Sequence, residues 1–236
     1  MRLLAIETST ETGSVAWLED GRCLAELVFR RKNSHSEVLA EALAQVAALA
    51  GRRVGDAEGV ALSAGPGSYT GLRIGTSTAK GLCAALGLPL YPIDTLQAMA
   101  WAAGSHARLA GGALLAPMLD ARRMEVYTAL YREDGRVLRA SAPVIMDEQF
   151  LADVADDGPI LCLGNGVAKC IPLLAGRGSF IFLPEAEPMA RAVGELAYLH
   201  ISQGGKPADL AMFEPAYLKP FMGTAPRQPN GSLARA

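Results

Sequence analysis

The sequence predicts an α/β protein built from two similar halves, each with a mixed sheet and covering helices. The tetrapeptide Glu-Asp-Gly-Arg occurs at 19–22 and again at 133–136, an offset (133 − 19 = 114) close to half of the 236 residues. Each copy places Asp-Gly, a hairpin signal, between two runs of strand-forming residues. After each of these strand regions the pattern changes to alternating helices and strands, which is typical of a mixed sheet with helices on its faces.

The first half begins with three predicted strands and a helix. The strands cover 3–7, 14–18 and 22–29. The helix begins at Ser34, where Glu37 completes a capping box, and Gly51 ends it. One face of this helix is apolar and carries Val38, Leu39, Ala42, Leu43, Val46 and Leu49.

A glycine-rich turn joins the next strand, 60–64, to a helix over 70–86. The helix carries a row of small residues at Gly71, Gly75, Ala79 and Cys83, so a second helix is expected to approach closely. A strand over 88–93 and a helix over 95–103 complete this half.

The glycine-rich turn itself matches neither of two nucleotide loops. It lacks the Gly-Lys-Ser or Gly-Lys-Thr ending of a P-loop, and Gly65-x-Gly67-x-x-x-Gly71 does not have dinucleotide-loop spacing. Backbone N–H groups at such a turn suit an anion or a close contact with another backbone. We interpret it as a tight structural connection, with an anion site as the alternative.

The second half repeats the three-strand start and then alternates helices and strands. We expect a linker near 104–112, which divides the chain into an N-terminal domain over 1–104 and a C-terminal domain over 105–222, with a mobile tail over 223–236. The predicted strands are 113–119, 125–131, 136–141, 160–163 and 179–183, and the predicted helices are 147–154 and 188–202. Two such halves in series correspond to the duplicated ribonuclease-H-like architecture of actin, Hsp70 and sugar kinases, which does not fix the chemistry.

Composition limits the class of protein. The net charge is −2, from 22 basic and 24 acidic residues, so no overall positive field attracts a nucleic acid. No signal peptide or membrane-spanning run is recognised, and we expect a cytoplasmic protein. The four cysteines lack Cys-x-x-Cys spacing and are expected to be buried and reduced. A solvated surface is the expected place of Arg30, Arg31, Lys32, Arg52, Arg53, Arg122 and Arg123.

Six segments together resemble the TsaB family, formerly YeaZ. They are Ala5-Ile-Glu-Thr-Ser-Thr10, His35-Ser-Glu37, Gly65-Pro-Gly-Ser-Tyr-Thr-Gly-Leu-Arg-Ile-Gly75, Met118-Leu-Asp-Ala-Arg122, Glu125-Val-Tyr127 and Glu214-Pro-Ala-Tyr-Leu-Lys219. The resemblance covers nearly the whole chain up to about Phe221. It implies a bacterial, noncatalytic subunit that supports its paralogue TsaD in making threonylcarbamoyladenosine at position 37 of tRNAs that read ANN codons. Implied partners are TsaD, the ATPase TsaE and a second copy, with tRNA reached indirectly.

Catalytic and cofactor residues are not expected in this chain. The catalytic paralogue binds a metal through a His-x-x-x-His pair, and Thr95 and Met99 stand at the corresponding positions. His35 is expected to have a capping or surface role. Gly164 and Gly166 follow a strand where this fold often seats adenine, so weak nucleotide binding there is the alternative to a plain turn.

The leading hypothesis is a partner surface on the first two long helices, 34–50 and 70–86. A stand-alone ATP-dependent transferase or kinase, with Glu7 and Asp120 holding Mg²⁺ across a cleft, is the enzyme alternative. A sugar-binding or structural module is a third reading. The expected interface residues are Leu39, Leu43, Val46, Gly71, Leu72, Gly75, Ala79 and Leu82.

Overall fold

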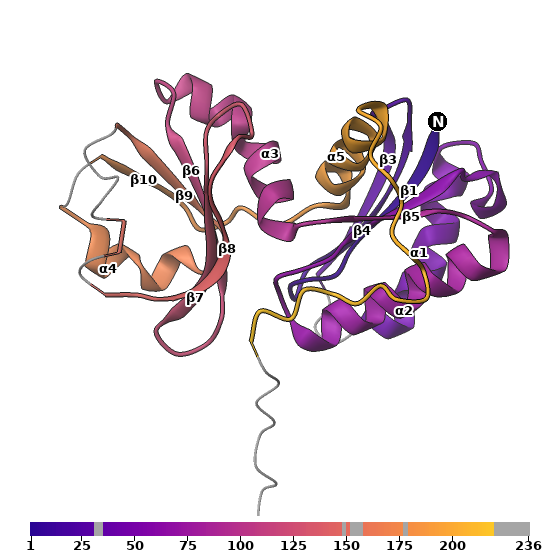
Figure 1. Ribbon diagram of the computed structural model, residues 1–236, viewed down its shortest axis with the longest axis horizontal. Coiled ribbons are helices and arrows are strands. Elements are labelled where there is room, and N and C mark those ends of the chain that lie inside the picture. The colour runs from indigo at the N-terminus through magenta and orange to yellow at the C-terminus, as the bar shows by residue number, and fades with distance from the viewer. Residues whose placement is uncertain (31–34, 148–149, 152–157, 177–178, 220–236) are drawn as a thin grey trace, which may run out of the picture.

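Two five-stranded mixed sheets form two lobes that lie side by side (Figure 1). The structure, a computed structural model, describes residues 1–30, 35–147, 150–151, 158–176 and 179–219. The strand order is β3-β2-β1-β4-β5 in the N-terminal lobe and β10-β9-β6-β7-β8 in the C-terminal lobe. Since each order places the first strand of its half in the centre, the two sheets have the same topology. The predicted duplicated α/β architecture is confirmed.

The N-terminal sheet begins with an antiparallel meander. Asp20 and Gly21 form its first turn with φ angles of 48° and 78°, in the left-handed region that this turn requires. The next two strands run parallel to the first, as helical crossovers demand. The five strands are β1 (Arg2–Glu7), β2 (Gly13–Glu19), β3 (Arg22–Phe29), β4 (Gly59–Ser63) and β5 (Leu90–Ile93).

Helices α1 (His35–Leu49) and α2 (Tyr69–Leu86) cover one face of this sheet. Ser68 caps α2 by accepting a hydrogen bond from the Gly71 N–H at 3.3 Å. Gly87 ends α2 with a φ of 67°, which favours glycine. A 3₁₀ turn, η1 (Val54–Asp56), connects α1 to β4.

The C-terminal lobe repeats the meander and the parallel strands. The second Asp-Gly turn is closed by a hydrogen bond from the Gly135 N–H to the Arg132 carbonyl at 2.9 Å. The elements are β6 (Leu114–Asp120), β7 (Glu125–Tyr131), β8 (Val137–Ile145), β9 (Ile160–Leu163), η2 (Val167–Lys169), α4 (Ile171–Leu174) and β10 (Phe180–Leu183).

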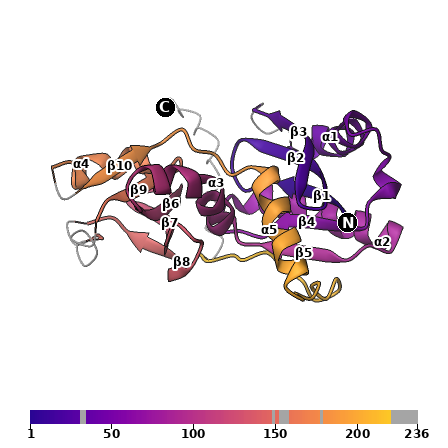
Figure 2. The same cartoon turned by 90° about the horizontal axis from the view of Figure 1, so that it is seen from above.

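The two lobes exchange a helix, which the sequence did not predict. Helix α3 (Thr95–Leu109) leaves the N-terminal sheet and packs its apolar face on β6 and β7. Helix α5 (Ala190–Ser202) returns to the free face of the N-terminal sheet, against β1 and β2 (Figure 2). The predicted linker at 104–112 is therefore wrong over most of its length, since α3 continues to Leu109. A division into 1–104 and 105–222 likewise cuts through α3 and assigns α5 to the wrong sheet.

The chain after α5 follows the N-terminal lobe and then reaches the other lobe (Figure 1). We call residues 206–219 the strap. The Ala208 N–H donates to the Leu90 carbonyl at 2.8 Å, and the Ala216 N–H donates to the Ala64 carbonyl at 2.7 Å. The tail predicted over 223–236 and most of the helix predicted over 147–154 lie outside the described residues. Among the helices described, none combines the length and apolar character needed to span a bilayer.

Candidate functional site

The loop after β1 encloses a buried carboxylate. Glu7 is completely buried, and its Oε1 accepts a hydrogen bond from the Ser9 N–H at 2.5 Å. Its Oε2 is buried without a hydrogen-bond partner among the described residues. Burial raises the pKa of Glu7, and the nearby Ser63 and Ser9, whose N–H binds Oε1, only partly oppose this effect. The enclosed site therefore disfavours the charged form of this carboxyl relative to water.

The glycine-rich segment packs directly on this loop. The Ser68 N–H donates to the Ser9 carbonyl at 2.6 Å, and Thr8 Oγ1 donates to the Gly71 carbonyl at 2.9 Å. A side chain at Gly67 would stand 2.5 Å from the Ser9 carbonyl oxygen, so only glycine permits this approach. Of the two interpretations of the turn, the close contact with another backbone is the one observed.

His35 lies inside the N-terminal lobe, which corrects the expected surface role. Its side chain is buried, and Nε2 lies 2.8 Å from the Thr10 carbonyl oxygen. The ring packs edge-on against Phe29 at 5.5 Å. His35 therefore joins α1 to the loop after β1.

Asp120 is engaged within its own lobe. Its Oδ1 accepts a hydrogen bond from Lys169 Nζ at 2.6 Å and one from the Arg122 N–H at 2.7 Å. Glu7, by contrast, is enclosed in the N-terminal core, so the two carboxylates have separate partners. Over the described ranges, no group of three or more His, Cys, Asp and Glu residues has an arrangement that could hold a metal ion.

Thr95 and Met99 fill core positions at the start of α3. Thr95 is fully buried, and its Oγ1 lies 2.7 Å from Ser63 Oγ, within hydrogen-bond distance. Met99 is 2% exposed and packs with the apolar side chains under the C-terminal sheet. The two positions corresponding to the metal-binding pair thus carry a hydroxyl bonded to its neighbour and a core thioether.

The Gly164-Asn165-Gly166 turn packs closely on β6. Gly164 has a φ of 111°, and the Gly166 N–H donates to the Met118 carbonyl at 3.0 Å. Asn165 Oδ1 accepts from the Asp120 N–H at 2.8 Å. A plain turn accounts for these contacts, and nucleotide binding at Gly164 and Gly166 stays a prediction.

The expected interface residues lie mainly in the core. A Cβ on Gly75 would overlap Thr8 Oγ1, so the row of small residues on α2 accommodates the loop after β1 rather than another helix. Leu82 is half-buried against the same core. The residues that are buried are Leu39, Leu43, Val46, Gly71, Leu72, Gly75 and Ala79.

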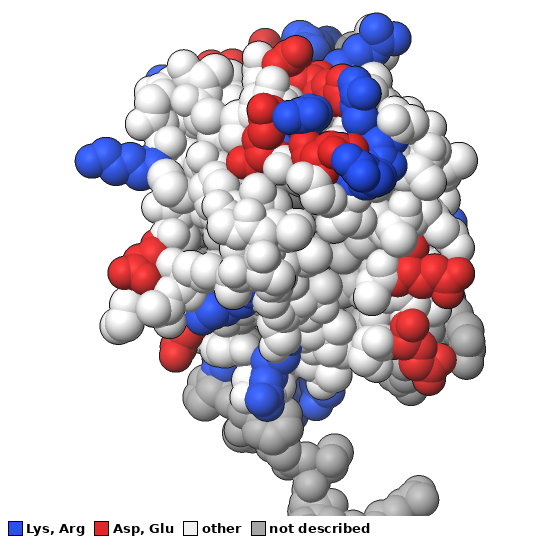
Figure 3. Space-filling model, turned by 90° about the vertical axis from the view of Figure 1, so that its right-hand side faces the viewer, with Lys and Arg blue, Asp and Glu red and all other residues white. Residues whose placement is uncertain are grey.

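A different row of each helix is exposed. Because α1 residues four apart lie on one face, Ala40, Ala44 and Ala48 form an exposed stripe of methyl groups. On α2, Ser77 and Gly81 are exposed, and a Cβ on Gly81 would meet no described atom within 4 Å beyond its chain neighbours and the local helix backbone. We call these residues, with the exposed Ala84, the small-residue face. Figure 3 shows that charged side chains cluster at the upper end of this side of the molecule and also lie along its edges and lower end, around an uncharged centre.

Comparison with known proteins identifies the family. The family model described as "TsaD: tRNA N6-adenosine threonylcarbamoyltransferase" matches residues 23–155. The tRNA threonylcarbamoyladenosine biosynthesis protein TsaB of Bacillus subtilis is 30% identical over 223 residues, covering 93% of this chain and 94% of the relative. The chain belongs to the TsaB (YeaZ) family.

Solved structures agree with membership of the TsaB family. YeaZ from Pseudomonas aeruginosa superposes with a TM-score of 0.78 at 27% identity, over 92% of this chain and 99% of that one. Component A of (R)-2-hydroxyglutaryl-CoA dehydratase from Acidaminococcus fermentans has a TM-score of 0.52 at 11% identity, over 86% and 99% of the chains. The second likeness shows the shared fold alone. The TsaB family is one of tRNA threonylcarbamoyladenosine biosynthesis.

Proposed function

We propose that this TsaB-family chain is a noncatalytic scaffold that binds its paralogue TsaD through the small-residue face. In this role it supports TsaD in transferring threonylcarbamoyl to N6 of adenosine 37 in tRNAs that read ANN codons. TsaE joins the pair, a second copy of the chain competes for the same face, and the assembly works in the cytoplasm.

The observation that carries this proposal is the exposed pair of small-residue stripes on α1 and α2. The distance between packed helices is set by the side chains at the contact, so Ala44 and Gly81 permit an unusually close approach. The opposite faces of the same helices are filled by the lobe's own core, which makes the helix pair rigid. A rigid surface that needs little ordering on binding favours association.

The surroundings of the candidate catalytic and metal-site residues support a noncatalytic role. Glu7 is enclosed, Asp120 is paired with Lys169, and Thr95 and Met99 pack in the core. Asp120 and Thr95 are bonded to structural partners, and Glu7 and Met99 are enclosed by the core. We therefore assign the chemical step to TsaD.

Ala44→Arg tests the interface with little risk to the fold. Ala44 is exposed in the middle of α1, and a guanidinium there meets water in the free monomer. In the complex the same group is desolvated without a partner, so binding to TsaD of the same genome should weaken about 30-fold or more. Titration calorimetry measures the affinity, and threonylcarbamoylation of tRNA by TsaD and TsaE with each variant measures the functional effect.

Ala102→Arg is the matched control. Ala102 is an exposed alanine in the middle of α3, so this variant has the same added charge and bulk on a helix away from α1 and α2. The control should bind TsaD as the wild type does. Equal affinities for the two variants would contradict the interface, and tRNA modification by TsaD and TsaE at full rate without the chain would contradict the scaffold role.

A further inference from the structure

The turn between β6 and β7 holds two arginines in a backbone conformation that arginine seldom adopts. Arg122 and Arg123 have φ angles of 66° and 52°, in the left-handed region that glycine and asparagine favour. The Glu125 N–H closes the turn by donating to the Arg122 carbonyl at 3.2 Å. Strained positions of this kind are concentrated at functional sites, so the turn merits a functional explanation.

Lys169 braces the turn from the C-terminal lobe. Its Nζ donates to Asp120 Oδ1 at 2.6 Å and to the Arg123 carbonyl at 2.9 Å, and it also bonds the Glu125 carbonyl. This one ammonium group therefore holds both ends of the turn. It also neutralises Asp120, one of the two carboxylates that flank the arginines in sequence.

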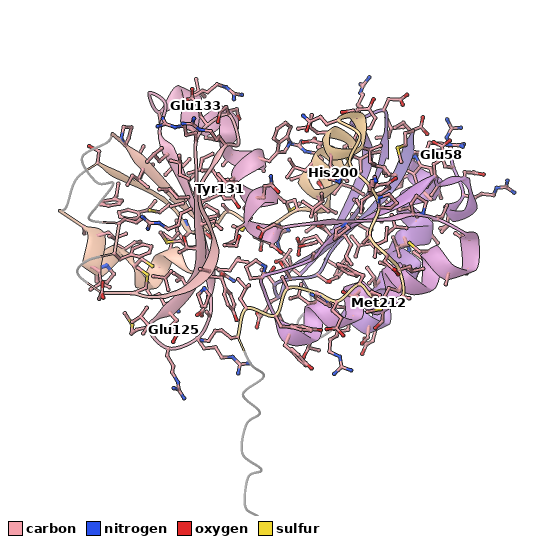
Figure 4. All side chains as sticks on the ribbon, in the orientation of Figure 1. Glu58, Glu125, Tyr131, Glu133, His200 and Met212 are labelled. Atoms are coloured by element: carbon pink, nitrogen blue, oxygen red, sulfur yellow. The ribbon has the colours of Figure 1, made fainter. Side chains whose placement is uncertain are left out.

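The strap braces the same turn from the other side. Lys219 Nζ donates to the Ala121 carbonyl at 3.2 Å and pairs with the Glu125 carboxylate. Figure 4 places Glu125 at the lower edge of the C-terminal lobe, where the strap crosses between the lobes. Both carboxylates that flank the turn are thus paired with lysines rather than with Arg122 or Arg123.

The two guanidinium groups project from the turn without a partner among the described residues. Within that part of the chain, neither Arg122 nor Arg123 forms an ion pair or a side-chain hydrogen bond, and both are exposed beside Met124, which is 48% exposed. The four basic groups of the cluster exceed its two carboxylates, Asp120 and Glu125, by two charges. In a chain with a net charge of −2, this is a local positive feature on a rigid turn.

The shape of the turn selects the kind of anion. Small ligands bind in concave pockets that cover most of their surface, whereas these arginines stand at the exposed tip of a hairpin. A planar guanidinium group can donate two parallel hydrogen bonds to two oxygens of one phosphate. Two arginines that project from the same turn therefore suit the backbone of a polyanion that passes over the tip of the hairpin. The RNA backbone supplies such a series of negatively charged phosphates.

We propose that the Ala121–Glu125 turn, which we call the arginine hairpin, is a direct RNA-backbone contact of this subunit. Arg122 and Arg123 each bind one phosphodiester, and the two lysines hold them in position. The choice of tRNA as the RNA rests on the proposed function. The hairpin contributes affinity and orientation but no base specificity, because phosphate contacts carry no sequence information.

Arg122→Asn with Arg123→Gly tests the proposal and preserves the turn. Asparagine and glycine accept positive φ, so the melting temperature should stay the same or rise by about 2–4 °C. Binding of the full chain to unmodified tRNA, measured by fluorescence anisotropy, should weaken about tenfold or more at low salt. The log–log slope of affinity against salt should fall by about 0.7–0.9 for each phosphate that is no longer neutralised.

Arg52→Asn with Arg53→Gly is the matched control with the same change in charge. Arg52 is already paired with Glu19 at 2.7 Å and Arg53 with Asp56 at 3.4 Å, so this variant should bind tRNA as the wild type does. Unchanged tRNA affinity in the hairpin variant, or an equal loss in both variants, overturns the proposal. Competition by micromolar tripolyphosphate that requires Arg122 and Arg123 identifies a small-anion site instead and also overturns it.

Binding to TsaD is measured separately on the same hairpin variant. The hairpin is in the C-terminal lobe and the small-residue face is in the N-terminal lobe, so TsaD affinity should be unchanged. If the wild-type chain binds tRNA through the hairpin but does not bind TsaD, the scaffold role fails and the RNA contact stands. If it binds TsaD but the hairpin variant retains full tRNA affinity, only the RNA contact fails.

Discussion

Two glycines of α2, Gly71 and Gly81, should respond in opposite directions to the same substitution. A methyl group at Gly71 would stand 2.0 Å from the Thr8 carbonyl oxygen, where ordinary van der Waals contact begins near 3.4 Å. Among the described residues, a methyl group at Gly81 would meet no atom within 4 Å beyond its chain neighbours and the local helix backbone. Both residues lie in one helix, so helix propensity alone predicts a gain at either position.

The magnitudes follow from these two environments. Gly81→Ala should raise the free energy of unfolding by about 1 kcal/mol, which is the helix-propensity difference between alanine and glycine. At Gly71 that gain is opposed by about 3 kcal/mol of overpacking strain. The hydrogen bond from Thr8 Oγ1 to the Gly71 carbonyl is also displaced, at a cost of about 1 kcal/mol. Gly71→Ala should therefore lower the free energy of unfolding by about 3 kcal/mol.

Differential scanning calorimetry of the two variants measures the contrast. At about 3 °C per kcal/mol for a chain of this size, the melting temperature should fall by about 9 °C for Gly71→Ala and rise by about 3 °C for Gly81→Ala. The backbone contact with Thr8 would be refuted by a Gly71→Ala variant as stable as Gly81→Ala. Gly75 is a poor position for testing the interface with TsaD. A Cβ there would overlap Thr8 Oγ1, so its substitution would perturb the monomer itself.

Two further predictions concern buried titratable groups. Burial raises the pKa of Glu7 above its ordinary 4.5, so the folded state retains a proton that the unfolded chain loses. The contribution of Glu7 to the free energy of unfolding should therefore fall as the pH rises from 4.5 to the folded pKa. Subtracting the Glu7→Gln melting temperatures from those of the wild type across this range isolates the effect, and parallel curves would contradict it. Burial also raises the pKa of Cys162 to about 12 and that of the half-buried Cys23 to about 11. The thiols of the native protein should therefore react slowly with an aromatic disulfide reagent at pH 8, and Cys23 should react before the others. In guanidinium-unfolded protein all four thiols should react rapidly.

The sequence by itself determined the duplication and the order of the strands and long helices, but it did not predict the short helix α4 between β9 and β10. Strand and helix periodicity, the two Asp-Gly turns and the capping residues are local signals, because each depends on neighbours within a few residues. Strands β3, β7 and β9 have the predicted bounds, and the other described strands and the long helices differ at their ends. The main errors in extent are α3 and β8, which continue beyond their predicted ends.

Only the tertiary structure decided which surfaces meet. Helix α2 carries one small-residue row at Gly71 and Gly75 and another at Ser77 and Gly81, and helical periodicity gives no reason to prefer either for the core. The path of the loop after β1 makes the choice, because the Thr8 backbone needs the space that Gly71 leaves. The positions of α3 and α5 were also decided only by the tertiary structure. The apolar face of a helix indicates that the face is buried, but it does not indicate which of the two sheets buries it.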